Sequence, residues 1–149
     1  MKPEGRPAVT VRPARDDAEV EAAQQLRVEV FCDEQGVPRE IELDGSDQGT
    51  TLIVALDDQD LIGTCRLRFA GDTCTLERMA VQADRRREGV GWTLLAGAED
   101  EARRGGGSEM RLKGQLAARG FYERGGYAAV SEEIIKDAGI DHVAMRKAL

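Results

Sequence analysis

The residues best suited to chemistry lie together in one short stretch, Arg85-Arg86-Arg87-Glu88-Gly89-Val90-Gly91. Glycine at positions 89 and 91 allows positive φ and close approach of the main chain to a ligand. A helix that begins here offers N–H groups with no partner inside the helix, at the positive end of its dipole. The arginines add full charges and forked donors that suit phosphate oxygens. The stretch therefore predicts a binding site for a phosphate-bearing ligand.

Two common phosphate motifs do not match this stretch. A P-loop places Lys directly after its second glycine, and no Lys follows Gly91. A dinucleotide-binding fingerprint needs a third small residue three positions later, where this chain has Leu94. Two interpretations remain, a phosphate turn of another kind and a plain glycine turn with solvated arginines.

The elements that would position this turn follow from the spacing of apolar residues. Residues 73–81 alternate as a strand does, directly before the turn. After the turn, apolar residues recur at the three- and four-residue steps of a helix with one buried face. These residues are Val90, Leu94, Leu95, Ala98 and Ala102. A strand–turn–helix is therefore expected, with the glycines at the helix start.

The whole chain alternates strands and helices in the order β-α-β-β-β-α-β-α-β-β. Asp16 and Glu19 form a capping pair for the first helix. The expected strands are residues 8–11, 50–56, 61–70, 73–81, 109–113, 127–135 and 141–147, and the expected helices are residues 17–31, 90–104 and 115–124. Residues 32–48 hold glycine, proline and many acids, so a loop with room for one short helical turn is expected there. The order predicts a mixed α/β domain.

Length and composition restrict the class of protein. The 149 residues suit one domain, expected to span residues 1–149 with a core from about residue 8, and 41% of them are hydrophobic. No apolar run approaches the roughly 20 residues of a membrane span, and no export leader is recognisable, so a cytoplasmic protein without a membrane partner is expected. A net charge of −7 argues against nucleic-acid binding. Cys32, Cys65 and Cys74 form no metal-like cluster, so no metal is expected.

Two signatures carry a resemblance to a known family. The spacing Arg86-x-x-Gly89-x-Gly91 on a strand–turn–helix resembles the acetyl-CoA signature of the GNAT family of N-acetyltransferases. Residues 115–127, QLAARGFYERGGY, are similar to its second signature. That run departs from the family pattern at Gln115, where Asn is usual, and at Tyr127, where Phe is usual.

Other stretches resemble one bacterial and archaeal subfamily whose acceptor is unassigned. These are residues 30–38, VFCDEQGVP, and residues 139–143, GIDHV. Members often carry a His at the start of the strand after the acidic loop, where this chain has Thr50-Thr51-Leu52. If that His helps to bind the acceptor, this chain binds its acceptor differently.

The resemblance implies a fold, a reaction and a set of binding residues. The fold would be a single GNAT-type domain with a central, mixed, mostly antiparallel, twisted sheet flanked by helices. The reaction would move an acetyl group from acetyl-CoA, as co-substrate, to a small-molecule or peptide amine, by direct transfer in a ternary complex. Residues 86–91 would bind the pyrophosphate, and residues 79–81 would lie along the pantetheine arm. The implied cofactor-binding residues are Met79, Ala80, Val81, Arg86, Arg87, Glu88, Gly89, Val90, Gly91 and Gln115.

Tyr122 and Glu77 are the candidate catalytic residues. Tyr122 matches the position of the family's general acid for the leaving thiolate. A phenol suits this role, because it stays protonated at neutral pH and can donate. Its alternative is an aromatic core residue with a satisfied hydroxyl. Glu77 is the first candidate for the base, because some family members carry Glu at this place. Its alternative is a structural carboxylate that pairs with Arg78 or Arg66 across strands.

Glu34, Gln35 and His142 are the candidate acceptor-binding residues. His142 is the only histidine, and its alternative is a satisfied structural residue. Glu34 and Gln35 lie on the loop that also carries Glu40, Glu42 and Asp44. This loop would suit a cationic amine, and its alternative is a solvated acidic surface.

A non-catalytic domain that senses acyl-CoA is the alternative class of function. A sensor needs the phosphate turn but neither Tyr122 nor Glu77. Trp92 either stacks on the cofactor or covers the helix start. The resemblance also admits a homodimer.

Overall fold

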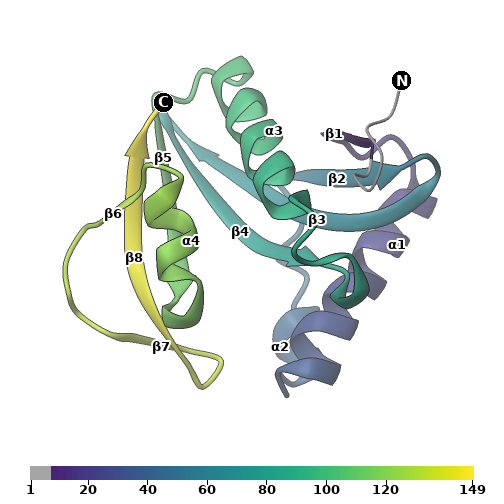
Figure 1. Ribbon diagram of the computed structural model, residues 1–149, viewed down its shortest axis with the longest axis horizontal. Helices are drawn as coiled ribbons and strands as arrows, with labels where there is room; N and C mark the ends of the chain where they lie inside the picture. Colours follow the sequence, from purple (N-terminus) through teal and green to yellow (C-terminus); the bar gives the residue numbers. More distant parts are fainter. Residues whose placement is uncertain (1–7) are drawn as a thin grey trace.

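The computed structural model describes residues 8–149 as one sheet with helices on both faces (Figure 1). The strands are β1 (Val9–Pro13), β2 (Thr51–Asp57), β3 (Asp60–Ala70), β4 (Thr73–Val81), β5 (Glu109–Gln115), β6 (Ala128–Ala129), β7 (Ile135–Asp137) and β8 (Ile140–Ala148). The helices are α1 (Asp17–Arg27), α2 (Arg39–Glu42), α3 (Val90–Arg104) and α4 (Arg119–Arg124). A π-helical segment, Val28–Glu34, continues α1, and short 3₁₀ segments lie at Ala83–Arg85 and Leu116–Ala118. No helix within residues 8–149 is long and apolar enough to cross a membrane.

The sheet is mixed and mostly antiparallel, as predicted. Its strand order is β1-β2-β3-β4-β5-β8-β6, and β7 also pairs with β8. β4 and β5 form its parallel pair, joined by the crossover helix α3. The other pairs are antiparallel. A parallel crossover of this length needs a helix, and the apolar stripe of α3 supplies one.

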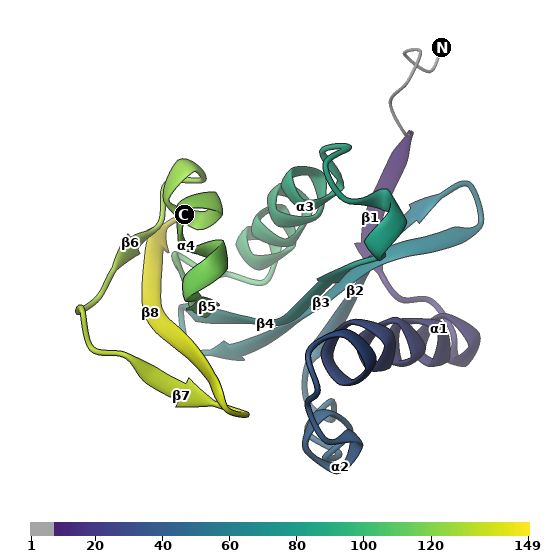
Figure 2. The same ribbon diagram turned by 60° about the horizontal axis from the view of Figure 1, so that its bottom comes forward.

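Helices cover the sheet in two layers. α1 and α2 lie on one face, and α3 and α4 lie on the other (Figure 2). Strand β2 shows why both faces are apolar. Its Ile53 and Ala55 belong to the core beneath α3, whereas Val54 and Leu56 pack with Ala23 of α1. Alternate side chains of a strand point to opposite faces, so an apolar run of this kind suits a sheet buried on both sides.

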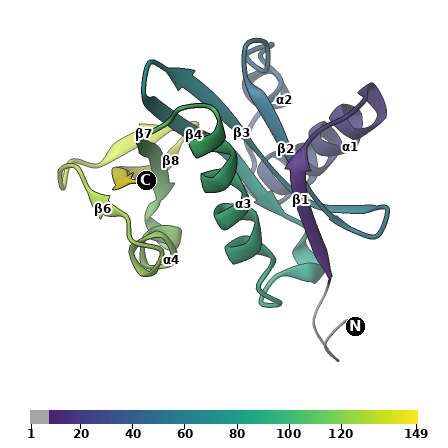
Figure 3. The ribbon, with the colours of Figure 1, turned by 90° about the horizontal axis from the view of Figure 1, so that it is seen from above.

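The two halves of the sheet separate at its centre. β4 and β5 pair only from Thr73–Leu76 to Glu109–Leu112. Beyond this seam the two strands diverge, which gives the V seen in Figure 1 and the separate β5–β8 half seen in Figure 3. β5 keeps its pairing with β8 as far as Gln115 and His142. The inner edge of β4 beyond Leu76 is therefore left without a neighbouring strand.

A β-bulge in β4 determines which side chains face each layer. Arg66 pairs with Glu77 and Thr64 pairs with Ala80, so two residues of β4 oppose one of β3. Arg78 lies in this bulge with φ of +56°, in the left-handed region. The extra residue reverses the alternation that follows it. Met79 consequently joins the core on the α3 side, whereas Ala80 packs on the α1 side.

The structure differs from the sequence prediction at three places. The expected strand over residues 127–135 is wrong, since only the short β6 and β7 pair there. The intervening residues Val130–Ile134 are all exposed, so no packing holds them in an extended register. In the expected loop over residues 32–48, the four-residue α2 is the one short helical turn that was allowed for, but the π-helical segment also continues to Glu34. The expected helix over residues 115–124 begins only at Leu116, because β5 extends to Gln115.

Candidate active site

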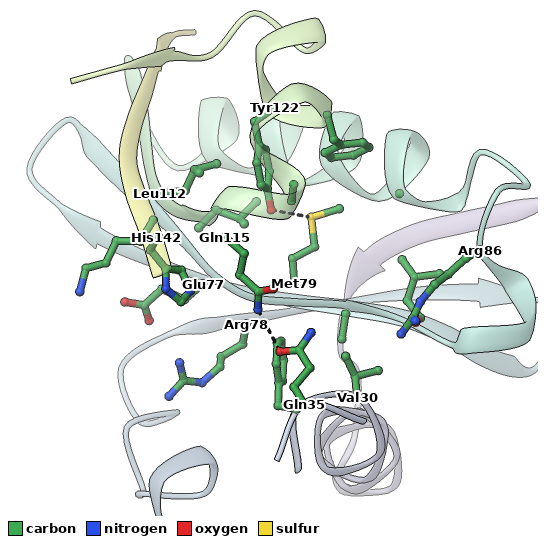
Figure 4. A pocket seen from close by; sticks show the side chains of 18 of the residues that line it. Val30, Gln35, Glu77, Arg78, Met79, Arg86, Leu112, Gln115, Tyr122 and His142 are labelled. Carbon is green, nitrogen blue, oxygen red and sulfur yellow. Dashed lines mark hydrogen bonds between the residues drawn. The ribbon is translucent and has the colours of Figure 1, made fainter. Parts of the chain in front are cut away.

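A cavity of about 820 Å³ lies where β4 and β5 diverge (Figure 4). It is lined by the far half of β4, the end of β5, the turn before α3, the aromatic face of α4 and the end of the π-helical segment. Among the predicted site residues, those that line it are Gln35, Glu77, Met79, Ala80, Val81, Arg86, Arg87, Gly89, Gly91, Gln115, Tyr122 and His142. Segments far apart in the sequence therefore form one site.

The turn before α3 offers bare main-chain donors. Gly89 caps the helix in the left-handed conformation, with φ of +85° and no side-chain cap. The first hydrogen bond of the helix runs from the N–H of Thr93 to the carbonyl of Gly89. The N–H groups of Val90, Gly91 and Trp92 precede that bond, so they have no acceptor inside the helix. No acid lies in the first turn to occupy them.

The three arginines of the turn have different surroundings. Arg85 is engaged by Asp57 at 2.7 Å and by Glu88 at 3.1 Å. Arg86 donates to both carboxylate oxygens of Glu34, at 2.8 and 2.9 Å, and to the carbonyl of Val81. Arg87 lines the cavity and makes no hydrogen bond or ion pair within residues 8–149. The expected anion site therefore depends on Arg87 and the main chain more than on Arg85.

Tyr122 belongs to α4 and lies beside Met79 of β4, on the α4 side of the cavity. Its side chain is 8% exposed, and its ring packs edge-on against Phe121 and Tyr127. The hydroxyl donates to the sulfur of Met79 at 3.6 Å (Figure 4). Burial raises the pKa of Tyr122 to about 12. Because a thioether is a weak acceptor, the phenolic proton is not committed to a strong partner.

His142 reaches the cavity from the opposite strand, β8. It is buried, and its Nδ1 lies 2.7 Å from the carbonyl oxygen of Ile140. A carbonyl can only accept, so Nδ1 carries the proton of the neutral ring. Nε2 is then left with a free lone pair. The ring is thus fixed in the tautomer that a proton acceptor requires.

Glu77 lines the cavity but is also part of an ion-pair network. Its Oε1 accepts from Arg66 at 2.8 Å and from Arg68 at 3.2 Å. The alternative interpretation of Glu77, a structural pair with Arg66, is therefore present in the structure. Arg78 pairs instead with Glu42, from its Nε to Oε2 at 2.9 Å.

The network continues beneath the cavity. Arg27 is 1% exposed and donates to Glu42 at 2.6 Å and to Asp47 at 2.7 Å. Asp47 also accepts from Arg66 at 2.7 Å. The ion pairs of this network connect α1, α2, the loop before β2 and the β3–β4 pair. Glu42 is only 2% exposed, so for this residue the expected solvated acidic surface is wrong.

One hydrogen bond crosses the cavity. Gln115, at the end of β5, donates through Nε2 to Oε1 of Gln35 at 2.9 Å (Figure 4). The two residues are 80 positions apart in the sequence. Glu34, next to Gln35, does not line the cavity and instead holds Arg86. The bond between the two glutamines links the two halves of the sheet across the V.

Other residues differ from the sequence prediction in their position. Glu88 and Val90 do not line the cavity, since Glu88 pairs with Arg85 and Val90 is buried in the core. Trp92 packs on Phe121, with ring centroids 4.4 Å apart, and also lines the cavity. The lining residues that sequence reasoning did not assign to the site include Phe31, Arg78, Lys113, Arg124 and Asp137. No local pattern marks them, because the bulge and the divergence of β4 and β5 bring them to the cavity.

Comparison with known families identifies the domain. The family model described as the acetyltransferase (GNAT) domain matches residues 15–149. The chain belongs to the GNAT family. It is therefore an acyltransferase, and the predicted family and enzyme class are confirmed.

Relatives of this GNAT chain are known in sequence and in structure. The uncharacterized N-acetyltransferase YjcF of Bacillus subtilis (strain 168) is 36% identical over 90% of this chain and 96% of its own. A Lactobacillus plantarum protein, provisionally described as an N-acetyltransferase, has a solved structure with a TM-score of 0.87 and 30% identity, covering 95% of this chain and 99% of its own. A GNAT family acetyltransferase from Elizabethkingia anophelis, solved with acetyl-CoA bound, shares the fold at a TM-score of 0.74 and 16% identity, covering 95% and 98% of the two chains.

Proposed function

We propose that this GNAT protein moves an acetyl group from acetyl-CoA to a primary amine, by direct transfer while both substrates are bound. One observation carries the proposal. The bare main-chain donors of the turn and the unpaired Arg87 open into the same cavity as Tyr122 and His142. A phosphate site and two groups able to handle protons are the parts that acetyl transfer from a phosphate-bearing thioester requires.

The residues present fit acetyl-CoA. In the proposal, the N–H groups of residues 90–92 and the Arg87 guanidinium bind the pyrophosphate. The unpaired edge of β4 from Met79 to Val81 binds the pantetheine arm as an added strand would. The aromatic face of Phe121 and Trp92 lies beside that path. The bound thioester supplies the activated acetyl group, and a main-chain N–H near Met79 or Ala80 stabilises the oxyanion.

Proton removal from the amine is assigned to His142. Glu77 accepts hydrogen bonds from Arg66 and Arg68 at Oε1, so its carboxylate already has a structural role in the ion-pair network. His142 has a free Nε2 in its fixed tautomer. The amine nitrogen loses a proton to Nε2 and forms a bond to the carbonyl carbon. Glu77 then acts by holding Arg66 and Arg68 in place.

Proton delivery to the leaving group is assigned to Tyr122. When the carbon–sulfur bond breaks, the electron pair goes to sulfur, and the phenol donates its proton there. Its hydroxyl already lies against a sulfur atom, that of Met79. This places the hydroxyl beside the edge of β4 along which the pantetheine arm would lie.

A covalent acyl-cysteine route has little support. Cys65 and Cys74 are fully buried, and burial raises the pKa of both thiols, that of Cys74 to about 11. Burial likewise raises the pKa of Cys32. None of the three lines the cavity. A buried protonated thiol is a weak nucleophile, which favours direct transfer.

The decisive experiment measures release of the CoA thiol from acetyl-CoA across a panel of primary amines. Gly91→Val should abolish both acetyl-CoA binding and turnover. An added Cβ at this position would lie 3.4 Å from the Phe121 ring, and the larger valine side chain would fill the turn. Thr93→Val is the matched control in the same helical turn, since Thr93 is exposed and does not line the cavity. Tight acetyl-CoA binding with no turnover on any amine would favour the acyl-CoA sensor instead.

The base assignment is tested in the same assay. His142→Ala should lower the rate and remove the acidic limb of the pH–rate profile, which reports protonation of the essential base, while Glu77→Gln should lower the rate and leave that limb in place. The reverse pattern would return the role of base to Glu77.

A further inference from the structure

Arg78 has an unusual backbone conformation for its residue type. It has φ of +56°, a region that glycine and asparagine enter far more readily than a long side chain. Such a conformation is strained and persists where the surrounding structure enforces it. Here the surrounding structure is the β-bulge of β4, which lies just beyond Leu76, where β4 and β5 diverge. In this backbone conformation the Arg78 side chain points towards the α1–α2 face, away from Tyr122 (Figure 4).

The guanidinium of Arg78 is held on one side and free on the other. Its Nε lies 2.9 Å from Oε2 of the buried Glu42. This contact is an ion pair without hydrogen-bond geometry, and within residues 8–149 the terminal nitrogens of Arg78 make no hydrogen bond either. The side chain is 24% exposed, and Arg78 lines the cavity. Glu42 therefore orients the fork while leaving its outer donors available.

The surroundings of Arg78 contain no free carboxylate. Two acids line the cavity, and both are engaged within the described chain. Glu77 accepts from Arg66 and Arg68, and Asp137 lies 3.9 Å from Lys113. Val30 and Phe31 add an apolar wall on the same side. This guanidinium is held in place, has terminal N–H donors without an acceptor and lies beside apolar side chains. It therefore suits a planar anionic group on an otherwise apolar molecule.

We propose that the amine acceptor carries a carboxylate and that Arg78 binds it with its two terminal nitrogens. This inference rests on the proposed acetyltransferase function and names the class of its acceptor. The acceptor is an amino acid or a similar amine with a carboxylate at one end. Its carboxylate lies at Arg78 on the α1–α2 side, and its amine lies towards His142 and the thioester.

The test compares matched acceptors that differ only at the anionic end. Linear ω-amino acids of two to six carbons are assayed beside their carboxamides, the parent alkylamines and the corresponding amino-alkyl phosphates. For the best chain length, kcat/KM should be at least about tenfold higher for the carboxylate than for the amide, as expected for charge-assisted hydrogen bonds. A higher kcat/KM for the phosphate than for the carboxylate would overturn the assignment of the anion.

Variants of Arg78 separate recognition from folding. Arg78→Asn and Arg78→Gly both tolerate the left-handed backbone, and Glu42 keeps its ion pair with Arg27 in each variant. Both should abolish the preference in kcat/KM for the carboxylate over the carboxamide. Arg111→Asn, on an exposed arginine of β5 outside the cavity, should keep the preference. Retention of the preference in both Arg78 variants would overturn the proposal.

Failure of this inference is distinguishable from failure of the proposed function. Equal turnover of carboxylate, amide and alkylamine would overturn the role of Arg78 and leave acetyl transfer standing. Absence of both acetyl-CoA binding and turnover with every amine would overturn the two together.

Discussion

Tyr122 combines a buried ring with an available proton. Its hydroxyl has a sulfur atom as its hydrogen-bond acceptor, and burial raises its pKa to about 12. The acid form is therefore present throughout the pH range in which a primary amine can be deprotonated. The ring packs against Gly114, where an added Cβ would lie 3.1 Å from the ring. Gly114 of β5 thus gives the phenol its place in the cavity.

Tyr122→Phe is predicted to separate catalysis from packing. The phenylalanine ring keeps the contacts with Phe121, Tyr127 and Gly114, so the melting temperature and acetyl-CoA affinity should change little. Turnover should fall about a hundredfold, the usual contribution of a general acid. Steady-state kinetics and calorimetry on the same preparations measure both. Unchanged turnover would show that solvent protonates the thiolate.

At the scale of single elements, α3 owes its position to a close contact with β1. A Cβ at Gly97 would lie 2.4 Å from Cγ1 of Val11 and 2.7 Å from its Cβ. Only glycine fits there without movement of one element. Since α3 carries the phosphate turn at its start, this contact also positions the cavity.

Gly97→Ala is predicted to destabilise the protein by about 1–3 kcal/mol, because overpacking forces the helix from the strand. Combining it with Val11→Ala should restore part of the loss, since the smaller side chain makes room. Urea unfolding of the two single variants and the double variant gives the coupling free energy. Strictly additive effects would contradict the contact.

The loop before β2 is held by Asp47. Burial opposes ionisation of this carboxyl, but hydrogen bonds from Arg27, Arg66 and Gln24 outweigh burial and lower its pKa to about 2. Its ordinary value is 3.8. A lowered pKa means that the ionised form stabilises the fold above about pH 4 and that this contribution is lost as the pH falls through about 2.

Asp47→Asn is therefore predicted to cost about 2–3 kcal/mol at neutral pH, which is what a pKa lowered from 3.8 to about 2 is worth. The difference in free energy of unfolding from the parent protein should shrink between about pH 4 and pH 2. Urea unfolding at several pH values measures it. Asp100→Asn, on an acid whose side chain is 61% exposed, should show almost no effect at any pH. A pH-independent loss in Asp47→Asn would contradict the assigned pKa.

At the scale of the whole molecule, the sheet is two half-sheets joined by a four-residue parallel seam. A ligand along the unpaired edge of β4 would contact both halves and the turn before α3. Ligand binding to the native state alone should stabilise the entire domain.

Acetyl-CoA is predicted to raise the melting temperature by about 5–10 °C at a hundredfold excess over Kd, since that excess adds about 2.7 kcal/mol. Adenosine, which lacks phosphates, should leave it unchanged. Thermal denaturation monitored by circular dichroism provides the measurement. Equal shifts with both compounds would mean that the turn does not bind phosphate.

Much of this molecule could be predicted because its signals are local. The alternation over residues 73–81 and the helical spacing after Gly89 lie within single elements, so the strand–turn–helix was predictable. The pairing of Arg86 with Glu34 joins residues 52 positions apart, and no local pattern encodes it. The bulge at Arg78 depends likewise on the register between β3 and β4. Roles that rest on long-range register were therefore missed, including the place of Arg78 in the cavity.

The buried ion pairs beneath the cavity restrict how proteins of this kind can diverge. Loss of Arg27 or Glu42 alone would break a buried ion pair and leave the remaining charge with one part-exposed partner, Asp47 or Arg78, which costs up to about 3–5 kcal/mol, a large share of a domain's stability. A substitution at one of these two positions is therefore destabilising, and the second position must change as well to compensate. Phe31 and Gln35 line the same cavity without belonging to the network. New acceptor preferences would arise at these two positions first, while the charged floor stays the same from ancestor to descendant.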